Sequence, residues 1–96
     1  MHFKRHEHGN TIVIASCDEG LLGKNLKDEK YDITISEKFY GTEKITDEEL
    51  AALFLEADSL NLFGKGAISV AVKQGLLSET QVIRICGIEH AVILKV

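Results

Sequence analysis

The residues of this chain best suited to covalent chemistry lie where an apolar segment ends. Residues 12–15 are apolar without a break, and Cys17 and Asp18 follow them closely. A cysteine nucleophile needs a base within reach, and His90 in a later loop would serve, with Asp18 or Glu19 orienting its imidazole. The competing interpretation is that Cys17 is only a small buried residue, which is the more common outcome for a cysteine that ends an apolar strand.

The two cysteines also suggest a metal site. Cys86 and His90 lie four residues apart across a predicted hairpin, and Cys17 would come from a neighbouring strand. These are ligand types that Zn²⁺ prefers, but a closed site needs four ligands and the chain has no Cys-x-x-Cys pair. Three histidines near the N-terminus share one strand face, which is more simply a solvated strand edge. We therefore expect no resident metal or other cofactor.

A candidate ligand site surrounds two glycines that precede a predicted helix. Gly64, Lys65 and Gly66 resemble in outline an anion site, in which free backbone N–H groups and a lysine meet a phosphate. Asn61 and Lys24, on loops expected nearby, would add polar contacts. The full pattern of a phosphate-binding loop, with its Lys-Ser or Lys-Thr ending, is absent. The alternative is that the two glycines only allow a sharp bend between packed elements.

Length and charge limit the classes of function. The 96 residues, of which 45% are hydrophobic and 27% charged, predict one globular domain over residues 1–96. No apolar run is long enough to cross a membrane and the start does not resemble a signal peptide, so we expect a cytoplasmic protein with two free thiols. The formal net charge is −4. Direct nucleic-acid binding would therefore need a local basic surface, and the lysines of residues 24–38 are interleaved with acids.

The first half of the chain has the pattern of β-structure. Residues 2–8 and 11–17 flank a Gly-Asn pair and predict a hairpin, in which the first strand is an edge strand because only one of its side chains is apolar. Residues 31–36 alternate between apolar and polar side chains and predict a third strand, to which residues 24–27 would pair as a short hairpin.

Two helices are predicted in the second half. Thr46 and Glu49 have the spacing of a capping box, so a helix should begin there and run over residues 47–58. Residues 59–63 have mixed character and are predicted to form a connector. A second helix is predicted from about residue 64 to a C-terminal cap at Gly75.

Two final strands complete the predicted fold. Residues 82–86 and 91–95 are apolar apart from Arg84 and Lys95, and they flank a loop over residues 87–90. The element order is strand, strand, strand, helix, helix, strand, strand. It predicts the α+β class, with a mostly antiparallel sheet of about five strands and two helices on one face. The predicted core packs helix residues on strand residues: Leu50, Leu53, Phe54, Ile68 and Val72 against Ile12, Ile14, Ile33, Ile35, Ile83 and Ile85.

Several short motifs together carry a family resemblance. They are residues 17–19 (Cys-Asp-Glu), 21–24 (Leu-Leu-Gly-Lys), 39–41 (Phe-Tyr-Gly), 60–62 (Leu-Asn-Leu), Gly64 before a helix rich in small residues, and 87–91 (Gly-Ile-Glu-His-Ala). With these motifs the chain resembles, over nearly its whole length, the short archaeal proteins of the domain of unknown function 424 family. The resemblance implies one compact intracellular domain of archaeal origin, and it assigns no catalytic residue.

The residues favour binding over catalysis. We expect a non-catalytic module that docks on a protein or ribonucleoprotein partner, because small acidic α+β domains without a convergent reactive set usually act through their surfaces. The alternative is a small enzyme or a metal or anion site around Cys17, Asp18 and His90. Any site should lie where residues 17–24, 61–66 and 87–90 come together.

Overall fold

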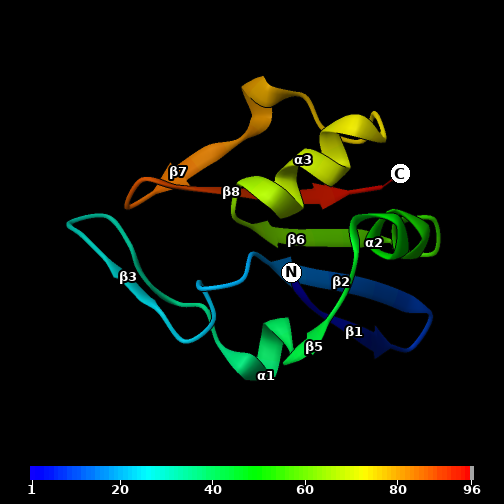
Figure 1. Ribbon diagram of the computed structural model, residues 1–96, viewed down its shortest axis with the longest axis horizontal. Coiled ribbons are helices and arrows are strands. Elements are labelled where there is room, and N and C mark those ends of the chain that lie inside the picture. The colour runs from blue at the N-terminus through cyan, green and yellow to red at the C-terminus, as the bar shows by residue number, and fades with distance from the viewer. Residues whose placement is uncertain (96) are drawn as a thin grey trace.

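The computed structural model describes residues 1–95 and shows a sheet with the two longer helices on one face and a hairpin with a short helix on the other (Figure 1). The strands are β1 (His2–His8), β2 (Thr11–Cys17), β3 (Asn25–Lys27), β4 (Asp32–Thr34), β5 (Glu43–Lys44), β6 (Ser59–Phe63), β7 (Ile83–Ile85) and β8 (Ile88–Leu94). The helices are α1 (Glu37–Tyr40), α2 (Asp47–Phe54), α3 (Lys65–Lys73) and a short 3-10 turn, η1 (Glu79–Gln81). Six strands form one sheet in the order β5-β1-β2-β6-β8-β7, and β3 pairs with β4. The predicted α+β class is confirmed, with six strands in the main sheet instead of about five.

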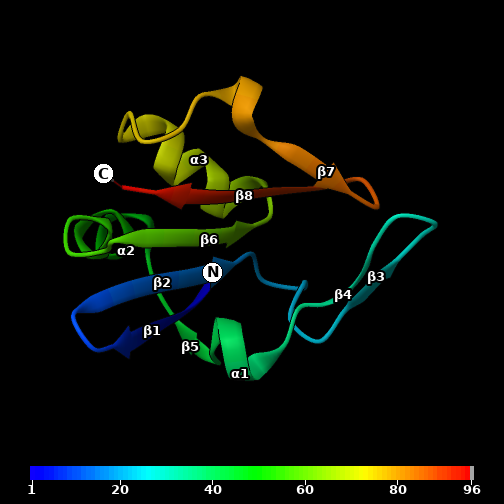
Figure 2. The ribbon, with the colours of Figure 1, turned by 180° about the vertical axis from the view of Figure 1, so that it is seen from behind.

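The centre of the sheet is a parallel pair that the sequence did not predict. β6 lies beside β2 in parallel register, from Val13 opposite Ser59 to Cys17 opposite Phe63, and antiparallel to β8 (Figure 2). The prediction of a connector over residues 59–63 was therefore wrong. Leu60 and Leu62 point into the helix-side core, whereas the polar Ser59 and Asn61 lie on the other, less covered face. The alternation of residues 59–62 is the pattern of a strand with one less covered face, but it is short and contains Ser and Asn, which are also common in connectors.

The helix side of the core follows the prediction in its main features. Thr46 caps α2, because its hydroxyl accepts from the Glu49 N–H at 3.2 Å and the Glu49 carboxylate accepts from the Thr46 N–H at 3.1 Å. The helix ends at Phe54, four residues earlier than predicted. Asp58 then accepts a hydrogen bond from the Ile12 N–H at 2.7 Å, which draws the chain out of the helix and into β6. The predicted stop of α3 at Gly75 is confirmed, since this glycine has φ of 73° and follows the last turn.

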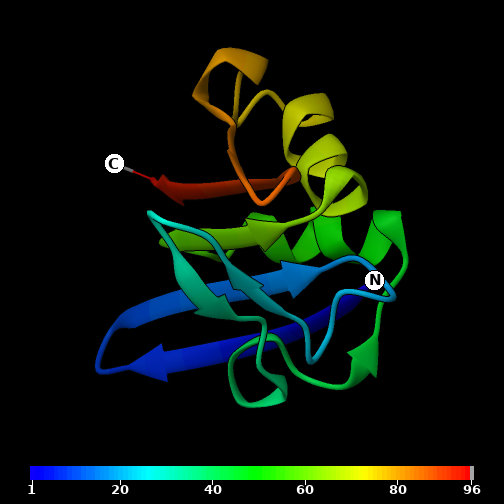
Figure 3. The ribbon, with the colours of Figure 1, turned by 90° about the vertical axis from the view of Figure 1, so that its left-hand side faces the viewer.

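A second core lies on the opposite face of the sheet. The β3–β4 hairpin and α1 cover this face at one end, where Leu26, Ile35 and Tyr40 pack with Phe63 and Ile85. In Figure 3, α2 and α3 lie to one side of the sheet and the β3–β4 hairpin stands apart from them. The prediction that the isoleucines of residues 33–35 and 83–85 face the two helices was therefore wrong. Alternation shows that a strand has an apolar face, but it does not show which layer covers that face.

The last hairpin turns earlier than predicted. Its two-residue turn is formed by Cys86 and Gly87, both at positive φ, so Glu89 and His90 lie within β8 and not in a loop. The first hairpin turns at Gly9 and Asn10 as predicted.

At the edge of the sheet, β5 pairs with the first two residues of β1, so only the rest of β1 is an edge strand. No helix within residues 1–95 is long and apolar enough to span a membrane.

Candidate functional site

Asp18 connects the end of β2 to the beginning of α3. Its Oδ2 accepts from the Gly66 N–H and its Oδ1 from the Ala67 N–H, each at 2.8 Å. Its own N–H donates to the Phe63 carbonyl at 3.0 Å, which fixes the end of β2 beside β6. A carboxylate at the N-terminus of a helix satisfies backbone donors that otherwise have no partner and interacts favourably with the helix dipole. The Asp18 side chain therefore caps the N-terminus of α3 from outside the helix, whose own N-cap residue is Gly64.

The two glycines before α3 make room for this carboxylate. A Cβ atom added at Gly64 would lie 2.5 Å from Cγ of Asp18, and one added at Gly66 would lie 2.7 Å from its Oδ1. Gly64 also has φ of 101°, a conformation that side-chain-bearing residues rarely adopt. The Gly66 and Ala67 N–H groups are thus bound by the protein's own Asp18, and the Gly64 N–H donates to the Glu89 carbonyl at 2.8 Å. This corrects the proposed anion site at Gly64, Lys65 and Gly66, because the N–H groups of both glycines are already occupied.

Cys17 lies in the second core and is held as a neutral thiol. Its side chain is fully buried, and burial, reinforced by the nearby Asp18 carboxylate, raises its pKa to about 11. Cys17 pairs with Phe63 across β2 and β6, and Phe63 pairs with His90 across β6 and β8. Cys17 and His90 therefore lie on strands that β6 separates, with their backbones roughly 9 to 10 Å apart, and Phe63 occupies the position between them. The predicted cysteine–histidine contact is not formed.

His90 is engaged by its neighbours. Its ring stacks on Phe63 with centroids 4.1 Å apart, and its Nδ1 lies 3.0 Å from the Leu62 carbonyl. Because a carbonyl only accepts hydrogen bonds, Nδ1 carries the proton and donates. Burial lowers the pKa of His90, an effect that this hydrogen bond partly opposes. The imidazole is thus a structural member of the second core.

The remaining predicted site residues are dispersed or already bonded. Asn61 accepts a hydrogen bond from the Tyr40 hydroxyl at 2.5 Å, which ties α1 to the sheet. Cys86 is exposed and donates from Sγ to Oδ2 of Asp28 at 3.7 Å, and Lys24 is exposed beside β3. Across residues 1–95, no three His, Cys, Asp or Glu side chains are placed to hold one metal ion. The predicted zinc ligands are accordingly not brought together.

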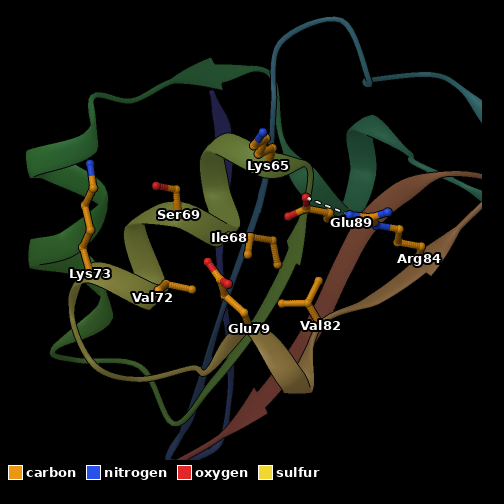
Figure 4. A pocket seen from close by; sticks show the side chains of 9 residues that line it. All are labelled: Lys65, Ile68, Ser69, Val72, Lys73, Glu79, Val82, Arg84 and Glu89. Atoms are coloured by element: carbon orange, nitrogen blue, oxygen red, sulfur yellow. Dashed lines mark ion pairs between the residues drawn. The ribbon is translucent and has the colours of Figure 1, made fainter.

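The clearest concavity lies elsewhere, between α3 and the segment that leads into the last hairpin. We call it the α3 groove; its volume is about 730 Å³ (Figure 4). It is lined by Lys65, Ile68, Ser69, Val72, Lys73, Glu79, Val82, Arg84 and Glu89. Among these, only Lys65 was a predicted site residue. The available signal was the spacing of four residues that places Lys65, Ser69 and Lys73 along one side of a helix.

Comparisons with known proteins show the family of the chain. The model of a family described as a protein of unknown function, DUF424, matches residues 6–96. The chain belongs to the DUF424 family. Among solved structures it is similar to an uncharacterized conserved protein from Methanopyrus kandleri, with 31% sequence identity, coverage of 97% of this chain and 90% of that chain, and a TM-score of 0.80. No curated protein matches.

The two thiols of this DUF424 protein should differ in reactivity. Cys86 is exposed and Cys17 is buried. Desolvation raises the pKa of both thiols, reinforced at Cys86 by Asp28 and at Cys17 by Asp18, so accessibility is what distinguishes them. Because only an accessible thiolate reacts quickly, a disulfide reagent at neutral pH should modify one thiol in the folded protein and the second only after denaturation. Mass spectrometry of the modified peptide should identify the first as Cys86. Rapid modification of Cys17 in the folded state would contradict its placement in the core.

His90 should make the stability of this DUF424 domain depend on pH. Its pKa is lowered from the ordinary value of 6.5, so the unfolded chain takes up this proton at a higher pH than the folded protein does. The free energy of unfolding contributed by neutral His90 is present above about pH 6.5 and should be lost as the pH falls toward the lower folded-state pKa. Denaturation curves between pH 7.5 and pH 5 would measure this. His90→Phe keeps an aromatic ring against Phe63 and should show a smaller decrease; equal slopes would contradict the assignment.

Proposed function

We propose that this DUF424 protein is a non-catalytic binding module that docks on a partner protein, free or within a ribonucleoprotein, through the α3 groove. The supporting observation is that the groove side chains are available to a partner, whereas the predicted reactive residues are not. Cys17, Asp18 and His90 are buried or bonded to the protein itself. Of the side chains that line the groove, only Ile68 is buried. The others are exposed or half-buried and so can contact a partner. Two free cysteines fit a reducing cytoplasm.

The composition of the groove suits a protein segment. Ile68, Val72 and Val82 give it an apolar floor that is continuous with the helix-side core. Charged side chains border this floor, as Figure 4 shows for Lys65 and Lys73 toward the two ends of α3 and for Glu79 beside Val82. An apolar centre within a charged rim is the usual arrangement of a protein-binding surface. The formal net charge of −4 disfavours RNA as the direct ligand and favours a protein component of any larger particle.

Site-specific photo-cross-linking tests this proposal. A benzoylphenylalanine residue at position 69 places the reactive group in the groove, and the same residue at position 55 reports on the C-terminal end of α2, where Leu55 is exposed. In lysate of the source organism, position 69 should give a discrete adduct that position 55 does not give. A third probe at position 92 reports on the open end of the sheet, where Val92 is exposed. Adducts from position 92 alone, or identical adducts from all three, would overturn the proposal.

A further inference from the structure

The side of the α3 groove formed by the helix is basic. Lys65, Ser69 and Lys73 follow at intervals of four residues, so the two lysines stand about 12 Å apart along the helix axis with a hydroxyl between them. Within residues 1–95, neither lysine has a carboxylate oxygen within 4 Å. The positive charge of this side is therefore not neutralised by the protein itself.

The opposite side of the groove is acidic in balance. Arg84 and Glu89 form an ion pair at 4.0 Å, drawn as the dashed line in Figure 4, so their charges largely cancel. Glu79 on η1 is exposed and has no cationic partner among the described residues. Among the described residues, the groove therefore has two unpaired lysines along α3 and one unpaired glutamate on η1.

Building on the proposed function, we infer that the α3 groove recognises an amphipathic segment of a partner protein. Apolar side chains of the segment pack on Val72 and Val82, acidic side chains face Lys65 and Lys73, and a basic side chain faces Glu79. Charge complementarity of this kind contributes specificity and association rate. A polyphosphate or RNA backbone fits less well, because the unpaired Glu79 would repel it and the second side offers no unpaired cation, since Arg84 is paired with Glu89.

Peptide selection tests this inference. Random 12-residue peptides displayed on phage are selected on the immobilised full-length protein, and the enriched sequences are synthesised and their affinities measured by fluorescence anisotropy. The enriched peptides should combine apolar residues with an excess of Asp and Glu. Lys65→Glu with Lys73→Glu should weaken binding by about tenfold or more at low salt. The matched control, Lys27→Glu with Lys38→Glu, changes the net charge equally at exposed positions outside the groove lining and should leave the affinity within about twofold.

One variant separates the inference from the proposed function on which it rests. Val72→Asp places a charge on the groove floor, and circular dichroism would verify that the variant is folded. Suppose that Val72→Asp abolishes peptide binding but the double lysine reversal has no effect. The α3 groove would then remain the binding surface, and the inference that its ligand is an acidic segment would be overturned. Peptide binding that survives both changes would also overturn the proposal that the α3 groove is the binding surface. Enrichment of basic peptides, failure to enrich any peptide, or tighter binding of a single-stranded RNA 20-mer would also refute the inference.

Discussion

Replacing Phe63 with alanine is expected to lower the free energy of unfolding by about 3 to 5 kcal/mol, the usual cost of removing a buried aromatic ring. Phe63 is 1% exposed and ends the central strand β6. Its ring is stacked on His90 and lies edge-on to Tyr40 at 5.7 Å. The cavity left by alanine would therefore open in the middle of the second core, where three elements meet. Urea denaturation followed by circular dichroism measures the loss.

Phe39→Ala is the matched control for this prediction. Phe39 lies farther along the same group of aromatic rings, is half-buried, and stacks on His6 at 4.9 Å. Because its ring keeps contact with water, truncation should cost about 1 to 2 kcal/mol. Equal losses in the two variants, or a loss below about 1 kcal/mol for Phe63→Ala, would contradict the described second core.

Asp18→Ala should lower the free energy of unfolding by about 2 to 3 kcal/mol, because it removes two hydrogen bonds to a charged acceptor and the cap of α3. The N–H groups of Gly66 and Ala67 would lose their partner at the start of the helix. Hydrogen exchange should then be faster in the first turn of α3. Denaturation midpoints give the energetic effect.

Asp18→Asn distinguishes a structural cap from a reactive carboxylate. Asparagine keeps one acceptor oxygen at the same position, so this variant should retain about half of the stability that alanine loses. A stable Asp18→Ala variant with unchanged exchange in α3 would show that the carboxylate does not cap the helix.

The sequence predicted best those features that depend on neighbouring residues. The first hairpin, the capping box at Thr46 and the stop of α3 at Gly75 each follow from a short pattern with a local physical cause. β6 could not be recognised in the same way. Ser59 and Asn61 alternate with buried leucines, but this strand pattern is too short to be separated from a connector, and its partners β2 and β8 lie far from it in sequence.

For the candidate site, the sequence likewise indicated the individual residues but not the contacts between segments that lie far apart in the chain. Cys17, Asp18 and the glycines before α3 were singled out because they interrupt apolar elements, and the structure brings Asp18 against Gly64 and Gly66. The Gly64 N–H also donates to the Glu89 carbonyl at 2.8 Å, so β8 reaches the same place. Sequence spacing could not show that these groups satisfy one another. Nor could it show the groove, since η1 and α3 meet only in the folded chain.

The docking surface is tested most directly by a map of backbone amide chemical shifts. The ¹⁵N-labelled protein is titrated with the partner recovered through position 69, and the shifts of residues 1–95 are followed. We predict the largest changes in α3 and over residues 79–89, with α2 and the exposed end of β8 unchanged. Changes confined to β1 or to the Val92 side of the sheet, with α3 unaffected, would contradict the α3 groove as the binding surface.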